Sequence, residues 1–174
     1  GKANVHAGTL AVPYYLKAKE PLTSYWQGTN STNLTRYNPT PKVKSTQTIP
    51  VLMSVPNATS LAGATPPATG WPVIIFQHGI TRSRIDMLAI ADTLADAGFA
   101  TVAIDLPLHG ITDTTNPLKA DLNPISTKDA ERTFNLDLRS NTTGATGADG
   151  VIDSSGSYFI NLSSLRTSRD NMRQ

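Results

Sequence analysis

Two short apolar runs, each followed by a His-Gly pair, limit the possible folds of this chain more than any other feature. The first lies in residues 71–80 (WPVIIFQHGI), and the second, one helix length later, lies in residues 100–110 (ATVAIDLPLHG). Short runs rich in β-branched residues are typical of strands that are covered on both faces, as in a parallel sheet. Ligands collect beyond the carboxyl ends of such strands, so both His-Gly segments are expected to border a site.

The segment between the two runs has the pattern of an amphipathic helix. Ser83 with Asp86 three residues later resembles a capping box, and Gly98 stands where a left-handed cap would end the helix. Arg84 falls mainly outside the apolar face. That face is formed by residues at helical spacing: Ile85, Leu88, Ala91, Leu94 and Ala95. A strand, a helix and a strand form a right-handed crossover, which predicts parallel pairing of the two strands.

Two further strands and two long polar excursions are predicted around this unit. Residues 5–16 contain a proline and fit an edge strand, and residues 46–55 read as a second strand. Residues 17–45 carry three aromatic side chains and form either a packed excursion or a mobile flap. Residues 111–153 are again polar, with a short helix expected at 127–134.

The whole pattern predicts an α/β fold: a mostly parallel sheet with an antiparallel edge at the N-terminus and flanking helices. With 174 residues the chain has room for one domain. A final helix is expected after a cap at Asn161 or Ser163 and runs through Leu165 and Met172. The domain over residues 1–174 is expected to be incomplete, because Gly-x-Ser-x-Gly, the turn that presents a serine nucleophile, occurs nowhere in it.

Composition excludes several classes of function. The net charge of +2 comes from scattered residues without a basic block, which argues against nucleic-acid binding. The absence of cysteine excludes disulfides and thiolate zinc sites, and no apolar run is long enough to span a membrane. The three histidines, His6, His78 and His109, match no metal-ligand spacing, and no glycine-rich nucleotide loop is present. Neither a metal nor a cofactor is therefore expected.

The first His-Gly segment, His78-Gly79-Ile80, is the strongest candidate for a site. In acyl transfer, the oxyanion of the tetrahedral intermediate needs preorganised donors, and backbone N–H groups in a turn between strand and helix are fixed in place. Gly79 would permit close approach of a substrate carbonyl. The alternative is a tight turn whose histidine bonds its own neighbours.

The second segment contains Asp105, His109 and Gly110 and allows three interpretations. It could hold a catalytic Asp/His pair, a metal site or a structural loop near the site. The structural loop is favoured, because Pro107 fixes a turn and residues four apart in an irregular segment need not converge.

The segments PVIIFQHGITRSR, LADAGFATVAIDLPLHG and LRTSRDNMRQ together resemble the amino-terminal half of α/β-hydrolases, and more closely bacterial extracellular lipases of the virulence-factor type. The resemblance implies that Ile80 donates its backbone N–H to the oxyanion, and that the terminal helix leads toward a fifth strand. It places the serine nucleophile, acid and histidine base beyond Gln174, so no catalytic residue of the triad is expected here. It further implies a secreted or cell-surface location and an ester or lipid substrate.

The expected function is that of an amino-terminal fragment of a lipase or esterase, inactive by itself. One alternative is a non-catalytic α/β binding or interaction domain that uses residues 17–45 for recognition. A peptidase or another acyl hydrolase would share every motif above. In the strand order that the resemblance implies, residues 73–76 have an unpaired outer edge, which predicts self-association through that edge or through residues 165–172.

Overall fold

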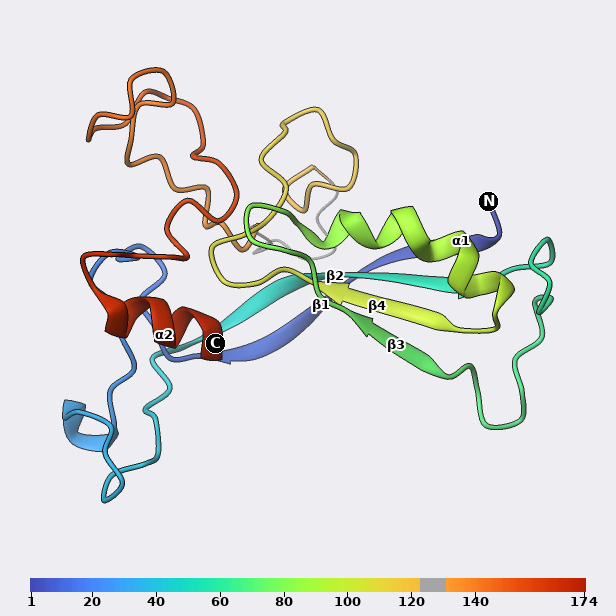
Figure 1. The fold of residues 1–174 in the computed structure, drawn as a ribbon, viewed down its shortest axis with the longest axis horizontal. Coiled ribbons are helices and arrows are strands. Elements are labelled where there is room, and N and C mark those ends of the chain that lie inside the picture. Colours follow the sequence, from blue (N-terminus) through green and yellow to red (C-terminus); the bar gives the residue numbers. More distant parts are fainter. Residues whose placement is uncertain (123–130) are drawn as a thin grey trace.

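A four-stranded sheet in the order β1-β2-β4-β3 forms the centre of the computed structural model, which describes residues 1–122 and 131–174 (Figure 1). The strands are β1 (Ala3–Tyr14), β2 (Ser45–Pro56), β3 (Val73–Phe76) and β4 (Ala100–Ile104). The helical elements are η1 (Thr29–Ser31), η2 (Arg84–Met87), α1 (Leu88–Asp96) and α2 (Leu165–Arg173).

Strand pairing combines a long antiparallel ribbon with one parallel pair. β1 runs antiparallel to β2 along their whole length, and β2 pairs antiparallel with β4. β3 pairs parallel with β4, with Val73 opposite Ala100 and Phe76 opposite Ala103. The parallel pairing predicted for these two strands is confirmed.

The predicted α/β fold class is nevertheless wrong. Two of the three strand pairs are antiparallel, and among the described residues only two short α-helices of nine residues each are found. The molecule is a small mixed sheet. The prediction extended one strand–helix–strand crossover to the whole sheet, whereas the two twelve-residue strands β1 and β2 contribute most of it. Where the structure describes them, the polar excursions form mainly loops and turns in place of flanking helices.

Helix α1 covers one face of the sheet and encloses a small core there (Figure 1). The core consists of Leu52, Met87, Ala91 and Ala103. The start of the helix differs from the prediction, because residues Arg84–Met87 form a 3₁₀ turn and the Ser83 side chain makes no capping bond. A 3₁₀ turn has three residues per turn, so it rotates the buried face, and Arg84 is buried instead of lying outside.

The strand β3 lies at the sheet edge, as expected, and carries exposed apolar side chains. Val73 is 59% exposed and Ile75 is 82% exposed. Both point away from the α1 face, because Ile75 is paired with Val102 on the opposite side from the buried Ala103. An unpaired edge with such side chains is a surface prone to association.

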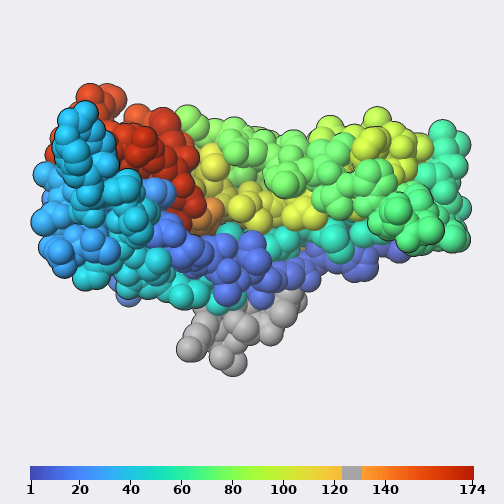
Figure 2. All heavy atoms as spheres, turned by 90° about the horizontal axis from the view of Figure 1, so that it is seen from below, coloured from blue at the N-terminus to red at the C-terminus, as the bar shows by residue number. Residues whose placement is uncertain are grey.

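The polar segment that follows β1 packs against the terminal helix at one end of an elongated molecule (Figure 2). The backbone N–H of Trp26 donates to the Asp170 carboxylate at 2.9 Å, and the backbone N–H of Tyr15 donates to Gln174 Oε1 at 2.8 Å. The rings of Tyr15 and Trp26 lie 4.8 Å apart. Of the two expectations for residues 17–45, the packed excursion is therefore the one observed.

The remaining predicted helices also differ in detail. The cap of α2 is Ser164, whose Oγ accepts from the Thr167 N–H, and neither Asn161 nor Ser163 takes that place. Of the helix expected at 127–134, the first part (127–130) lies outside the described residues, and the following residues form turns. No helix in the described ranges has the length and apolar character needed to cross a bilayer.

Candidate functional site

The two His-Gly segments meet where β3 and β4 end. The parallel pairing places both carboxyl ends at one edge of the sheet, and the rings of His78 and His109 lie 5.0 Å apart, both buried. The Leu106 N–H donates to His78 Nε2 at 3.0 Å. His78 Nδ1 lies 2.7 Å from the Gly79 carbonyl and carries the proton, because its other nitrogen accepts. His78 therefore links the ends of the two strands.

His109 links the second segment to the first. Its Nδ1 lies 2.8 Å from the Pro107 carbonyl, and its Nε2 accepts from the Thr81 N–H at 3.2 Å. Burial is the main cause that lowers the pKa of His109 to about 4; the bond to Pro107 opposes it, and the nearby His78 and Arg132 add to it. At neutral pH the ring is uncharged and its Nε2 lone pair remains an acceptor.

The predicted oxyanion segment forms a tight turn. The Arg82 N–H donates to the Gly79 carbonyl at 3.1 Å, which encloses Ile80 and Thr81. In the part of the chain that the structure describes, the Ile80 N–H has no hydrogen-bond partner, and Ile80 is 50% exposed. A Cβ at Gly79 would meet only Arg82 Cγ, at 3.9 Å, so the fold itself does not demand glycine there.

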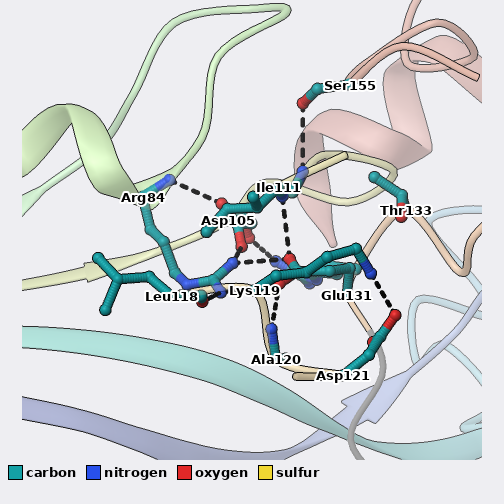
Figure 3. A network of polar contacts seen from close by, with 12 residues as sticks. Arg84, Asp105, Ile111, Leu118, Lys119, Ala120, Asp121, Glu131, Thr133 and Ser155 are labelled. Carbon is teal, nitrogen blue, oxygen red and sulfur yellow. Dashed lines mark hydrogen bonds and ion pairs between the residues drawn. The ribbon is translucent and has the colours of Figure 1, made fainter. Parts of the chain in front are cut away.

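A buried cluster of charges lies where the start of η2 meets the end of β4 (Figure 3). The Arg84 guanidinium binds the Asp105 carboxylate and both oxygens of Glu131, at 2.7 and 2.9 Å. The Arg84 backbone N–H also donates to Asp105, at 2.7 Å. Asp105 thus ties the end of β4 to the start of η2 and is not a free acid.

The charges in the cluster balance one another. Burial alone would lower the pKa of Arg84, but its bonds to Glu131 and Asp105 outweigh burial and raise it. Burial raises the pKa of Asp105 against the opposing effect of Arg84. A second guanidinium, that of Arg132, donates to the Asp105 backbone carbonyl. Burial lowers the pKa of Arg132. Two carboxylates therefore face two guanidinium groups in a site shielded from water.

Glu131 fixes the loop after β4. Its carboxylate accepts from the Ile111 N–H at 3.0 Å and from the Ala120 N–H at 2.7 Å (Figure 3). A Cβ at Gly110 would lie 2.5 Å from Glu131 Oε2, so this close approach requires glycine. The Gly110 N–H donates to Ser155 Oγ, which donates in turn to the Arg82 carbonyl at 2.7 Å.

The sequence therefore predicted the residues of the turn but not the buried side chains that hold the turn in place. His78, Gly79 and Ile80 lie together with Asp105, His109 and Gly110, whereas His6 stands apart on β1. Arg84, Glu131 and Ser155 were not predicted. Glu131 follows Arg84 by 47 residues, and no local pattern connects them.

A polar hollow of about 280 Å³ adjoins the turn, with Thr81, Ser83 and Gly110 among its lining residues. Across the described ranges, no serine hydroxyl is hydrogen-bonded to a histidine ring, and no group of acidic or histidine side chains could hold a metal ion. The arrangement can donate a backbone hydrogen bond, but the hydroxyl groups that line the hollow, those of Thr81, Ser83 and Ser155, have no histidine base among the described residues. Comparison with protein-family models, curated proteins and solved structures finds no match to this chain.

Proposed function

We propose that this chain supplies the oxyanion-binding part of a carboxylic ester hydrolase of the lipase or esterase type. A serine nucleophile outside residues 1–174 would complete the site, because Gly-x-Ser-x-Gly is missing from the sequence. The proposal includes an ester or lipid substrate and a secreted or cell-surface location. The observation that carries it is the Ile80 N–H, a backbone donor without a partner among the described residues, in a turn just beyond β3.

The chemistry follows from the position of that donor. As the serine attacks the ester carbonyl, negative charge develops on the carbonyl oxygen, and the Ile80 N–H would hold it. A donor that is fixed beforehand needs no reorganisation during the reaction. The neighbouring Thr81 N–H already donates to His109, so it is not available. The glycine at 79, which the fold does not require, leaves room for the carbonyl to approach.

A second candidate function is a non-catalytic interaction domain. The observation that favours it is Tyr37, which is 81% exposed in the polar segment after β1 and lies beneath the Arg36 guanidinium at 4.4 Å. Exposed aromatic side chains beside arginine are common in recognition surfaces. A protein of this class would bind a partner and show no ester hydrolysis.

The test replaces Ile80 in the protein that carries both this chain and the nucleophile. Ile80→Pro removes the N–H at the second position of a turn, where proline is favoured, and Ile80→Ala keeps it. With a p-nitrophenyl ester, the proline variant is expected to lose about 10²- to 10³-fold in kcat, and the alanine variant far less.

Three outcomes would count against the proposal. Equal kcat values for the two variants would show that the Ile80 N–H does not hold the oxyanion. Absence of ester hydrolysis in the unaltered protein would favour the interaction domain. Turnover by purified residues 1–174 would contradict the placement of the nucleophile elsewhere.

A further inference from the structure

The turn from Gly79 to Arg82, called the oxyanion turn below, contains a backbone conformation that rarely occurs. Thr81 has φ +71°, in the left-handed region. A β-branched side chain is disfavoured there, because its Cβ branches crowd the backbone. Such conformations persist only where the surrounding structure holds them, and they cluster at functional sites.

The contact that holds Thr81 comes from His109. The Thr81 N–H donates to His109 Nε2 at 3.2 Å, and Nδ1 on the other side of the ring contacts the Pro107 carbonyl at 2.8 Å. The bond at Nδ1 places the ring proton there and leaves Nε2 as the acceptor. The ring is fully buried, with an edge contact to Phe159 at 4.9 Å between centroids.

The chain closes tightly over this side of the ring. Gly156 has φ +75°, and a Cβ there would lie 2.4 Å from His109 Nε2. The Gly156 N–H donates to the Leu108 carbonyl at 2.9 Å, which holds the segment in place. Ser155, the preceding residue, reaches the oxyanion turn itself through the Arg82 carbonyl. The segment therefore covers His109 and braces the turn at once.

We infer that His109 is a positioning residue of the proposed ester hydrolase: it holds the Thr81 amide in its left-handed conformation and thereby orients the Ile80 amide toward the substrate. This inference rests on the proposed function. The Thr81 N–H and the Ile80 N–H belong to consecutive planar peptide units, which only the φ and ψ rotations of Ile80 separate. Fixing the Thr81 amide therefore restricts the orientation of the Ile80 amide. His109 itself touches no substrate and moves no proton.

The test compares His109→Phe with His109→Gln. Phenylalanine fills a similar volume without an acceptor, whereas glutamine keeps an oxygen that can accept from the Thr81 N–H. The first readout is amide hydrogen exchange at Thr81, measured by NMR on residues 1–174. The inference predicts at least tenfold faster exchange in the phenylalanine variant and near-normal exchange in the glutamine variant.

The second readout is steady-state kinetics in the protein that carries the nucleophile. The phenylalanine variant is expected to lose at least tenfold in kcat with little change in KM, and the glutamine variant to recover most of it. An unchanged Thr81 amide in the phenylalanine variant would overturn the inference. An inactive unaltered protein with a Thr81 amide that depends on His109 would overturn the proposed function and leave the positioning of the turn supported.

Discussion

Replacing Arg84 by methionine is expected to lower the free energy of unfolding by about 3 to 5 kcal/mol at pH 7. The Arg84 side chain is 3% exposed and is shared by Asp105 and Glu131, both of which are 0% exposed. Removal of the guanidinium leaves two carboxylates buried next to each other. Removing one partner of a buried ion pair is far more costly than the net contribution of the intact pair, because the remaining charge keeps its desolvation penalty.

A matched control stands two residues earlier. Arg82 binds Asp86 through two nitrogens, both at 2.7 Å, but its side chain is 65% exposed. Exposed pairs of this i,i+4 type contribute about 0.3 to 0.5 kcal/mol. Arg82→Met and Arg84→Met thus make the same chemical change, the first at an exposed pair with one carboxylate and the second at a buried site with two. The difference between them reports the burial of the Arg84 cluster and its second carboxylate.

Urea unfolding followed by tryptophan fluorescence measures both variants. With a slope of about 1 to 3 kcal/mol per molar urea, the loss at Arg84 corresponds to a midpoint shift of about 1 M or more, and the loss at Arg82 to at most about 0.5 M. Equal midpoint shifts for the two variants would refute the reasoning, because they would show that the Arg84 cluster is open to water.

Three further predictions follow from buried and exposed groups elsewhere. The pKa of His109 falls from 6.5 in the unfolded chain to about 4 in the native state, so the unfolded chain takes up the proton first. Stability then falls by about 3 kcal/mol between pH 6.5 and 4, and thermal unfolding of His109→Gln should lack this part of the pH profile. Ser54 and Thr101 lie opposite each other on β2 and β4. Their hydroxyl groups are buried and have no hydrogen-bond partner among the described residues. Thr101→Val is thus expected to leave the free energy of unfolding unchanged or raise it by up to about 1 kcal/mol, and a loss above about 2 would reveal a missed partner. Ile75→Lys on the exposed edge of β3 should shift the mass measured by light scattering toward the monomer. An equally associated variant would place the contact elsewhere, with residues 165–172 next to be tested.

Local patterns in the sequence predicted the elements that depend on local information. The β-branched run of β3, the run of β4 and one helix length between them were enough for the parallel pair. The same patterns did not predict that a ribbon of two long antiparallel strands dominates the sheet. The partners in that ribbon, such as Tyr14 and Ser45, are separated by a long polar segment. The sequence of this segment has no periodic pattern that would predict the pairing.

In the candidate site, too, local sequence patterns predicted some residues, whereas others depend on contacts between distant segments. His78, Gly79 and Ile80 could be selected because they follow a strand directly, and their position at the sheet edge needs no other element. Arg84 could not be selected, because charged residues usually lie outside the apolar face of a helix and the 3₁₀ turn that buries it has no clear sequence signal. Its partner Glu131 comes from a distant loop, and only the folded chain brings the two together.

Amide hydrogen exchange at Ile80, resolved by NMR, tests the central claim most directly. Exchange should approach the rate of an unstructured peptide, because this N–H has no partner in the described chain, while the adjacent Thr81 exchanges more slowly through its bond to His109. An Ile80 amide as protected as that of Thr81 would show that the donor is already occupied, and the oxyanion assignment would then be wrong.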